Sequence, residues 1–329
     1  MDVQTATALT TRAQVLNEDA IAISAAQWLR EIPTLYLVFL IISTVATAVV
    51  IALAFVHLYV IHYYVRNEHM QTNLYFLALL FPIVGLTSLL RMYLLRSATF
   101  LYVISHTYVM VCLVMLVSLL RNLFGGSEMM SKYLFSRNEV IKFNTPPFCC
   151  CCKCIPTMQP TERALRHVAW LTLQSPIVRI VAEIINGIAF FEQSAYEEVG
   201  IFINVIEVIS MISALYGCNI TMNLGQEKQV PYRMTVVFQC VNLTQVFLTL
   251  QKFIFDMCGK YDAFTDSSLM ASGTKAMYWN SMALTMEMCA LSIAATILLT
   301  PSKSKFFDKS RRRGEELRNL PNKRSEDTV

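Results

Sequence analysis

Long runs of apolar residues recur along the chain and predict its architecture. Seven of them reach about 20 residues or more, the length that a helix needs to cross the hydrocarbon core of a bilayer. None alternates apolar and polar residues with a period of two, as a membrane-spanning β-strand does. The pattern therefore predicts an all-α membrane protein with seven transmembrane helices. The expected spans are Leu35–Tyr64, Leu74–Leu95, Thr99–Leu120, Val168–Phe191, Val199–Asn223, Tyr232–Phe255 and Met277–Leu299.

The composition agrees with this pattern. Of the 329 residues, 55% are hydrophobic and 15% are charged, whereas about 25% are charged in a typical soluble domain. We expect an N-terminal segment over 1–34, the helical domain over 35–299 and a basic tail over 300–329. Charged residues interrupt the first segment, so it does not resemble a secretory signal peptide. Within it, Val15–Leu29 is either an amphipathic surface helix with Trp28 at the interface or part of a frayed terminus.

The basic residues between the spans indicate the orientation. Loops 65–73, 121–167 and 224–231, together with the tail, carry 18 Lys and Arg residues, whereas the opposite side carries 5. Cytoplasmic loops are enriched in Lys and Arg. The N-terminus is therefore predicted outside and the C-terminus in the cytoplasm. The basic tail Lys303–Arg324 is expected to attract anionic membrane lipids.

Five of the ten cysteines lie together in the cytoplasmic loop over 121–167, a compartment that disfavours disulfides. Cys151 and Cys154 form a C-x-x-C pair, but no second pair lies near to complete a zinc site. Cytoplasmic cysteines close to a membrane are typical sites of S-acylation. We therefore expect covalent S-acyl chains and neither a metal nor another cofactor, with a chemically idle cluster as the main alternative. The expected lipidation sites are Cys149, Cys150, Cys151, Cys152 and Cys154.

Charged residues inside the spans are functional candidates, because charge within a bilayer is unfavourable. Arg179 and Glu183 share one face of the fourth helix at i,i+4 spacing. They form either a structural ion pair or a site where Arg179 binds an anionic headgroup and Glu183 holds it between transport events. Glu207 in the fifth span and Glu287 in the seventh could each pair with Arg179 instead. Further interior polar residues, expected to form interhelical hydrogen bonds, are Gln174, Asn186, Asn204, Asn219, Asn242 and Gln245.

Two arginines near the outer end of the second span, Arg91 and Arg96, are expected to snorkel to the membrane interface. Four cysteines inside the spans are expected to be small packing residues. They are Cys112, Cys218, Cys240 and Cys289.

Over roughly residues 35–300 the chain resembles the α-subunit family of the organic solute transporter. The resemblance rests on seven spans, the cysteine run after Pro146-Pro147-Phe148, Gln174 with Arg179, Phe238-Gln239 and Leu250-Gln251. The chain departs from the vertebrate-like members at Lys252, where a proline is expected. The resemblance implies facilitated transport of amphipathic organic anions, such as bile acids and conjugated steroids, across the plasma membrane. It also implies a small single-span β-subunit as partner, and a homo-oligomer is a further alternative.

The candidate substrate site combines the intramembrane charges with the glutamines of the resemblance. It comprises Arg179, Glu183, Gln174, Glu207, Glu287 and Gln251. The expected partners besides the β-subunit are a sterol-like or bile-acid-like substrate and membrane lipids, and no feature predicts nucleic-acid binding.

Two other functions remain alternatives. A heptahelical receptor has the same number of spans, but Arg121 at the end of the third span lacks a preceding acidic residue, and the seventh span has no N-P-x-x-Y. A membrane scaffold or trafficking protein without transport is equally compatible with acylated cysteines and a basic tail. No P-loop, H-E-x-x-H or G-x-S-x-G motif occurs, which disfavours an enzyme.

Overall fold

The computed structural model describes residues 24–144, 157–192, 196–261, 263–264, 270–300 and 304–307. Within these ranges the chain is helical, and its only β-type pairing is an isolated bridge between Ile141 and Met158. The cysteine run over 149–154, the first 23 residues and most of the basic tail lie outside the described residues.

Seven helical segments are long and apolar enough to cross a membrane, which confirms the predicted all-α architecture. They are α3 (Thr34–Tyr64), α4 with α5 (Glu68–Ala78, Leu80–Tyr93), α6 (Ala98–Phe124), α8 (Glu162–Glu192), α9 (Tyr196–Asn223), α11 with η4 and α12 (Met234–Val246, Phe247–Gln251, Lys252–Lys260) and α13 (Ser272–Leu298). The shorter helices are α2 (Ala25–Glu31), η1 (Leu95–Ser97), α7 (Ser127–Ser136), α10 (Gln226–Gln229) and η3 (Val230–Tyr232).

Local capping explains why several helices extend beyond the apolar runs. The second span begins at Glu68, six residues before the predicted start, because the Asn67 side chain accepts hydrogen bonds from the backbone N–H groups of His69 and Met70. Such a cap satisfies donors that a helix start leaves free. Helix α6 continues to Phe124 and ends at Gly125, which has a φ of 84°. Glycine adopts this left-handed conformation without steric penalty and commonly ends helices.

Two spans are divided internally. Helix α4 ends at Ala78, four residues before Pro82. Proline has no N–H, and its ring clashes with the carbonyl four residues earlier, which explains the interruption of the helix at this point. In the sixth span the turn Phe247–Gln251 is a π-helix. Such insertions are rare and frequently mark functional positions.

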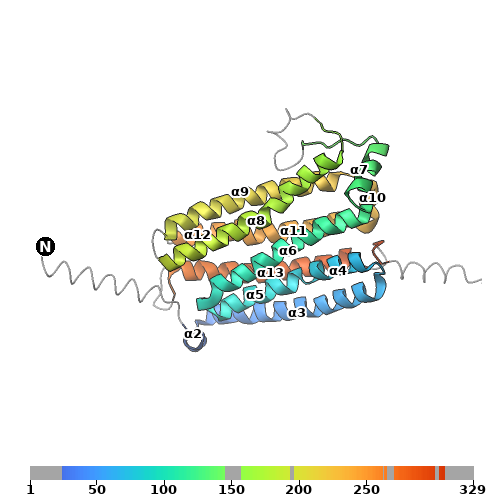
Figure 1. Cartoon of the computed structure of the whole chain (residues 1–329). Helices are drawn as coiled ribbons and strands as arrows, with labels where there is room; N and C mark the ends of the chain where they lie inside the picture. Colours follow the sequence, from blue (N-terminus) through green and yellow to red (C-terminus); the bar gives the residue numbers. More distant parts are fainter. Residues whose placement is uncertain are drawn as a thin grey trace, which may run out of the picture.

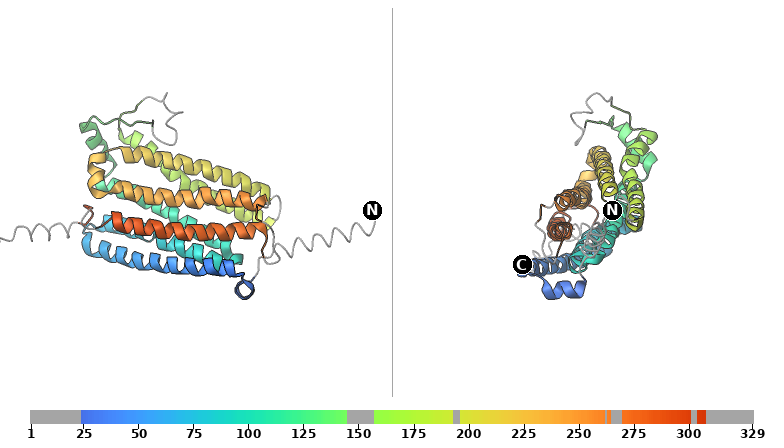
Figure 2. Two further views of the ribbon diagram at one scale, coloured as in Figure 1. Left: turned by 180° about the vertical axis from the view of Figure 1, so that it is seen from behind. Right: turned by 90° about the vertical axis from the view of Figure 1, so that its left-hand side faces the viewer.

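The helices form an elongated bundle. Helix α3 lies at one edge and the α8–α9 pair at the other, as the views in Figures 1 and 2 show. Helix α6 contacts α4, α5, α8 and α11, and α13 contacts α3, α5 and α12. We call the end that carries α2 and the start of α13 the α2 end, and the end that carries α7 and α10 the α7 end (Figure 1).

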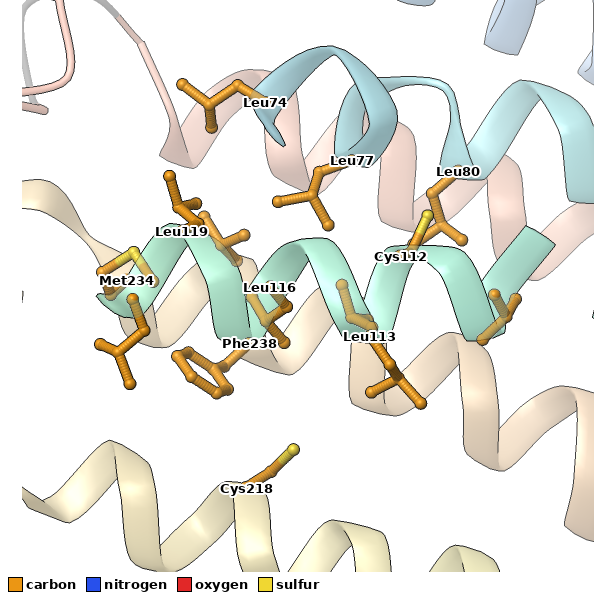
Figure 3. Packing of buried hydrophobic residues seen from close by; sticks show 14 of the residues in the cluster. Leu74, Leu77, Leu80, Cys112, Leu113, Leu116, Leu119, Cys218, Met234 and Phe238 are labelled. Carbon is orange, nitrogen blue, oxygen red and sulfur yellow. The ribbon is translucent and has the colours of Figure 1, made fainter. Parts of the chain in front are cut away.

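The apolar core is built around α6. Leu113, Leu116 and Leu119 of this helix are fully buried. Leu77 of α4 lies on one side of α6 and Phe238 of α11 on the other (Figure 3). Inside a bilayer the surrounding lipid is as apolar as these side chains, so close van der Waals contact rather than exclusion of water holds such helices together.

The outer faces are also apolar. On α3 the side chains of Ile41, Val45 and Phe55 are exposed, and on α8 those of Ile180 and Ile184 are exposed. An apolar surface that follows whole helices is atypical of soluble monomers. It is the surface expected where helices face lipid.

Trp28 does not face outward, contrary to the amphipathic-helix alternative for Val15–Leu29. Its side chain is fully buried between the bundle helices, and its indole N–H donates to the carbonyl of Met92 at 3.1 Å. The ring makes edge contacts with Tyr36 of α3 and Tyr278 of α13, at centroid distances of 6.0 and 5.9 Å. Three helices thus supply a pocket that an interfacial helix would not have, and they fix α2 to the bundle.

Candidate functional site

A buried ion pair links the fourth and fifth spans. The guanidinium of Arg179 on α8 pairs with the carboxylate of Glu207 on α9, and the two residues are only 3% and 4% exposed. The Nη2 of Arg179 also donates to the hydroxyl of Thr249, in the π-turn η4, at 2.7 Å. Three helices therefore meet at one cation. Of the three partners considered for Arg179, the structure selects Glu207.

Glu183 lies close to this pair but is not part of it. It is half-buried, and it forms no ion pair with any residue in the described ranges. Glu183 is within electrostatic range of Arg179, Glu207 and Lys252. The structure thus brings two candidate carboxylates near one arginine, and only one of them neutralises it.

The π-turn connects this pair to a second polar group towards the α2 end. Lys252, the residue after the turn, pairs with Asp256 of the same helix α12. The side-chain amide of Asn204 on α9 lies 3.4 Å from the same Asp256 carboxylate. Lys252 therefore carries a positive charge into the bundle, where Asp256 neutralises it.

Tyr102 of α6 is the aromatic centre of this second group. Its hydroxyl donates to the carbonyl of Leu248 in the π-turn at 3.2 Å. The ammonium of Lys252 lies 5.1 Å from the centroid of its ring, and the guanidinium carbon of Arg91 lies 5.3 Å from the same centroid. Both distances are within the range of cation–π attraction. The ring of His106, which is fully buried, lies 5.2 Å from that of Tyr102.

The prediction that Arg91 snorkels to the interface is wrong. Arg91 is 3% exposed and faces the bundle, whereas Arg96 in η1 is exposed. Arg91 lies on the face of α5 that meets α6, where the ring of Tyr102 attracts it. An aromatic partner inside the protein has replaced the expected contact with the interface.

Gln251 and Glu287, both candidates from the sequence, meet at the other side of the π-turn. With its amide nitrogen turned towards α13, Gln251 donates to the two carboxylate oxygens of Glu287 at 2.8 and 3.0 Å. The polar residues from the spans therefore form three neighbouring sets around the π-turn, at Arg179–Glu207, at Lys252–Asp256 and at Gln251–Glu287. Gln174 is half-buried on α8 but lies five residues before Arg179, so it does not share its helical face.

The other interior polar residues behave partly as expected. Gln245, which is fully buried, donates to the hydroxyl of Ser175 at 3.1 Å and so links α11 to α8. Cys112 and Cys218 are buried free thiols, whereas Cys240 and Cys289 are free but only partly buried. Among the described residues no group of three or more His, Cys, Asp or Glu side chains is arranged to hold a metal ion.

An apolar cavity of about 180 Å³ lies nearer the α7 end. Helices α3, α4, α5, α11 and α13 line it, and Phe306 and Phe307, which follow the last span, form part of its wall. His57 of α3 and Thr296 of α13 contribute polar atoms and contact each other at 2.7 Å. The bundle thus contains a charged region and a separate apolar cavity.

Several residues of the charged region are not among the site candidates that the sequence predicts. Lys252 and Asp256 have the i,i+4 spacing of a helical ion pair, a signal that was available, but the sixth span was expected to end at Phe255. Tyr102 and Thr249 carry no signal that separates them from other residues of apolar helices. Only the three-dimensional arrangement identifies them.

Comparison with known proteins identifies the family of this chain. The family model described as "Organic solute transporter Ostalpha" matches residues 39–304. The organic solute transporter alpha-like protein 1 of Caenorhabditis elegans is 36% identical over 287 residues, which cover 87% of this chain and 74% of that protein. The alpha-like protein 3 of the same organism is 30% identical over 290 residues, covering 87% and 83%.

The alpha-like protein 2 of Caenorhabditis elegans is 28% identical over 291 residues, covering 87% of this chain and 84% of that protein. No solved structure matches the chain. The family match includes most of the first span, the other six spans in full, the charged region and the cavity lining up to Thr300, whereas Phe306 and Phe307 lie beyond it. The chain therefore belongs to the organic solute transporter Ostalpha family.

Proposed function

We propose that this chain is the seven-span subunit of a facilitated transporter for amphipathic organic anions, with bile acids and conjugated steroids as substrate classes. The observation that carries the proposal is the charged region around the π-turn, where Arg179, Lys252 and Arg91 gather inside one helical bundle. Buried charges in membrane proteins commonly mark pathways for substrates or ions. Membership of a transporter family supports the same conclusion.

The apolar cavity supports the amphipathic part of the proposal. A substrate with a hydrocarbon body and one anionic group needs an apolar surface and a cation within one protein. The bundle offers both, in the cavity beside Phe81 and in the region beside Arg91, on the same helix α5. Ten residues separate these two positions, which corresponds to about 15 Å along a helix.

The proposal includes a plasma-membrane location, an external N-terminus and a cytoplasmic tail, which the distribution of basic residues favours. It also includes a small single-span β-subunit and S-acyl chains on Cys149–Cys152 and Cys154, residues that lie outside the described ranges. A scaffold or trafficking role without transport is the competing hypothesis. It predicts that the chain takes up neither a bile acid nor a conjugated steroid.

Uptake of a labelled steroid sulfate and a labelled bile acid into cells tests the proposal. The chain is expressed alone and together with a candidate single-span subunit, and surface labelling confirms equal amounts of protein. We expect uptake above that of untransfected cells. Transport should run down the substrate gradient, in either direction. A protein that reaches the surface with its partner and moves neither class would favour the scaffold.

A further inference from the structure

Arg91 is a buried cation, and two of its guanidinium nitrogens lack hydrogen-bond partners among the described residues. Its Nε and Nη1 atoms are inaccessible to solvent and have no hydrogen-bond partner within the described residues. No carboxylate in those ranges lies within ion-pair distance of it, although Asp256 is within electrostatic range. The ring of Tyr102 attracts the charge, but a π-face does not accept the hydrogen bonds of a planar fork as an anion does.

The neighbouring cations differ from Arg91 in that each is paired with a carboxylate, although Nη1 of Arg179 also lacks a hydrogen bond. Arg179 is neutralised by Glu207 and also donates to Thr249. Lys252 is neutralised by Asp256. An incoming anion would have to displace a carboxylate to reach either of them, whereas Arg91 offers its charge without such competition.

We propose that Arg91 binds the anionic group of the substrate, a sulfate or carboxylate carried by an apolar body. The inference rests on the proposed transport function and deepens it, since it moves the anion site from Arg179 to Arg91, for which the sequence predicts a position at the interface. The guanidinium of Arg91 has N–H groups without hydrogen-bond acceptors. The oxygens of a sulfate or carboxylate can accept hydrogen bonds from its planar fork.

The surroundings of Arg91 agree with a binding role. Tyr102 is held by its hydrogen bond to Leu248 in the π-turn, so the ring that positions Arg91 is itself fixed to the sixth span. The adjacent residue Met92 accepts the indole hydrogen bond of Trp28, so α2 lies against the same end of α5. Because the guanidinium is buried in this conformation, anion binding requires the side chains around the α2 end to move apart. The site is therefore accessible in one state of a transport cycle and closed in this one.

A buried charge without hydrogen-bond partners lowers stability, and this gives the inference a readout that separates it from a structural role. Removing a charge that lacks hydrogen bonds relieves an unfavourable burial. Removing a charge that is well paired instead leaves its partner charge buried and unpaired, which lowers stability. Arg91→Gln is therefore expected to leave the thermal midpoint of the substrate-free protein unchanged or to raise it.

The experiment compares the full-length wild-type chain with Arg91→Gln, Arg91→Lys and Arg96→Gln, each purified in detergent and each expressed in cells with the single-span partner. Pregnenolone sulfate is the anionic probe and pregnenolone its neutral counterpart. A ligand that binds only the folded state raises the thermal midpoint. The sulfate is expected to raise it in the wild type and in Arg96→Gln, and not in Arg91→Gln. Pregnenolone should give the same small shift in all four proteins.

Uptake of pregnenolone sulfate by Arg91→Gln should fall at least about tenfold, since a hydrogen bond to a charged group contributes enough for a factor of that size. Arg91→Lys, which keeps the charge but loses the planar fork, should lie between Arg91→Gln and the wild type. Wild-type sulfate shift or uptake in Arg91→Gln would overturn the inference.

The same data distinguish this inference from the proposed function. If the wild-type protein shows the sulfate-dependent thermal shift but no uptake, transport fails and the Arg91 site stands. If the wild type transports the sulfate and Arg91→Gln transports it equally well, transport stands and the Arg91 site fails.

Discussion

Arg179 on α8 pairs with Glu207 on α9, across the helix boundary, and not with Glu183 one turn along its own helix. The i,i+4 spacing placed Glu183 on the correct face, but the guanidinium pairs with the carboxylate of Glu207 from the adjacent helix instead. This arrangement joins two spans through charge rather than reinforcing one of them. It also changes which pair of substitutions should compensate each other.

Arg179→Ala or Glu207→Ala alone is expected to destabilise the protein by about 3–5 kcal/mol, since each leaves an unpaired charge in the bundle. The double variant removes both charges and should recover most of this loss. Thermal unfolding of the three variants in detergent measures the effect.

The control for this cycle is Glu183→Ala, alone and combined with Arg179→Ala. Since Glu183 has no ion pair within the described residues, its removal should be nearly neutral and should not rescue Arg179→Ala. Rescue by Glu183→Ala rather than by Glu207→Ala would show that the pairing in this structure is not the dominant one.

The seven-span architecture could be predicted from the sequence because each span depends on a local property, the length of an apolar run. The ends were less accurate, because they depend on single caps such as Asn67 and Gly125. The candidate site could be predicted only in part from the sequence. Charged residues such as Arg179 stand out in apolar helices, but their partners come from other helices, and the spacing along one helix cannot identify them.

Arg91 and Trp28 illustrate the same limit. General rules place a terminal arginine and a tryptophan at the membrane interface. In this fold Tyr102 and Met92 provide partners inside the bundle, so both side chains turn inward. Such choices depend on which helices are neighbours, and no sequence pattern in the individual spans specifies this.

The orientation of the chain can be tested with epitope tags at its two ends. The excess of Lys and Arg in loops 121–167 and in the tail predicts an external N-terminus and a cytoplasmic C-terminus. Antibody should reach the N-terminal tag on intact cells and the C-terminal tag only after permeabilisation. Labelling of both tags on intact cells, or of neither tag until the cells are permeabilised, would contradict the odd number of spans.

The cysteine run is expected to carry acyl chains attached through thioesters. Hydroxylamine cleaves thioesters, so treatment followed by a mass tag on the released thiols should shift the wild-type protein on a gel. Replacement of Cys149–Cys152 and Cys154 by Ser should abolish the shift. Replacement of the buried Cys112 and Cys218 is the matched control and should leave it intact. A wild-type protein without a hydroxylamine-dependent shift would exclude acylation.

The docking of α2 depends on Trp28. Trp28→Phe removes the hydrogen bond to Met92 and should lower the free energy of unfolding by about 1 kcal/mol. Trp28→Ala also removes the buried ring and should lower it by about 3–5 kcal/mol. Thermal unfolding measures both, and Leu29→Ala, at a position 47% exposed, should have little effect. Equal stability of Trp28→Ala and Leu29→Ala would mean that α2 does not dock.

The close packing of α8 on α9 depends on Gly217. A Cβ atom at this position would lie 2.8 Å from the hydroxyl of Thr172 and 2.9 Å from the Cβ of Leu171. Both distances are shorter than normal contacts, so the two helices would have to separate. Gly217→Ala should therefore destabilise the protein, although alanine favours helix by about 0.5–1 kcal/mol over glycine. The expected net loss is about 1–3 kcal/mol, the usual range for an overpacked contact.

Gly187 on α8 provides the matched control, because nothing lies within 4 Å of a Cβ built there. Gly187→Ala gains the helix preference without a clash and should be neutral or slightly more stable than the wild type. The two variants carry the same chemical change on the same pair of helices, so their difference in thermal midpoint isolates the contact with α8. The separation should also displace Glu207, on the same helix as Gly217, from Arg179. Uptake by Gly217→Ala is then expected to fall together with its stability, and two variants of equal stability would contradict the close approach of α8 and α9.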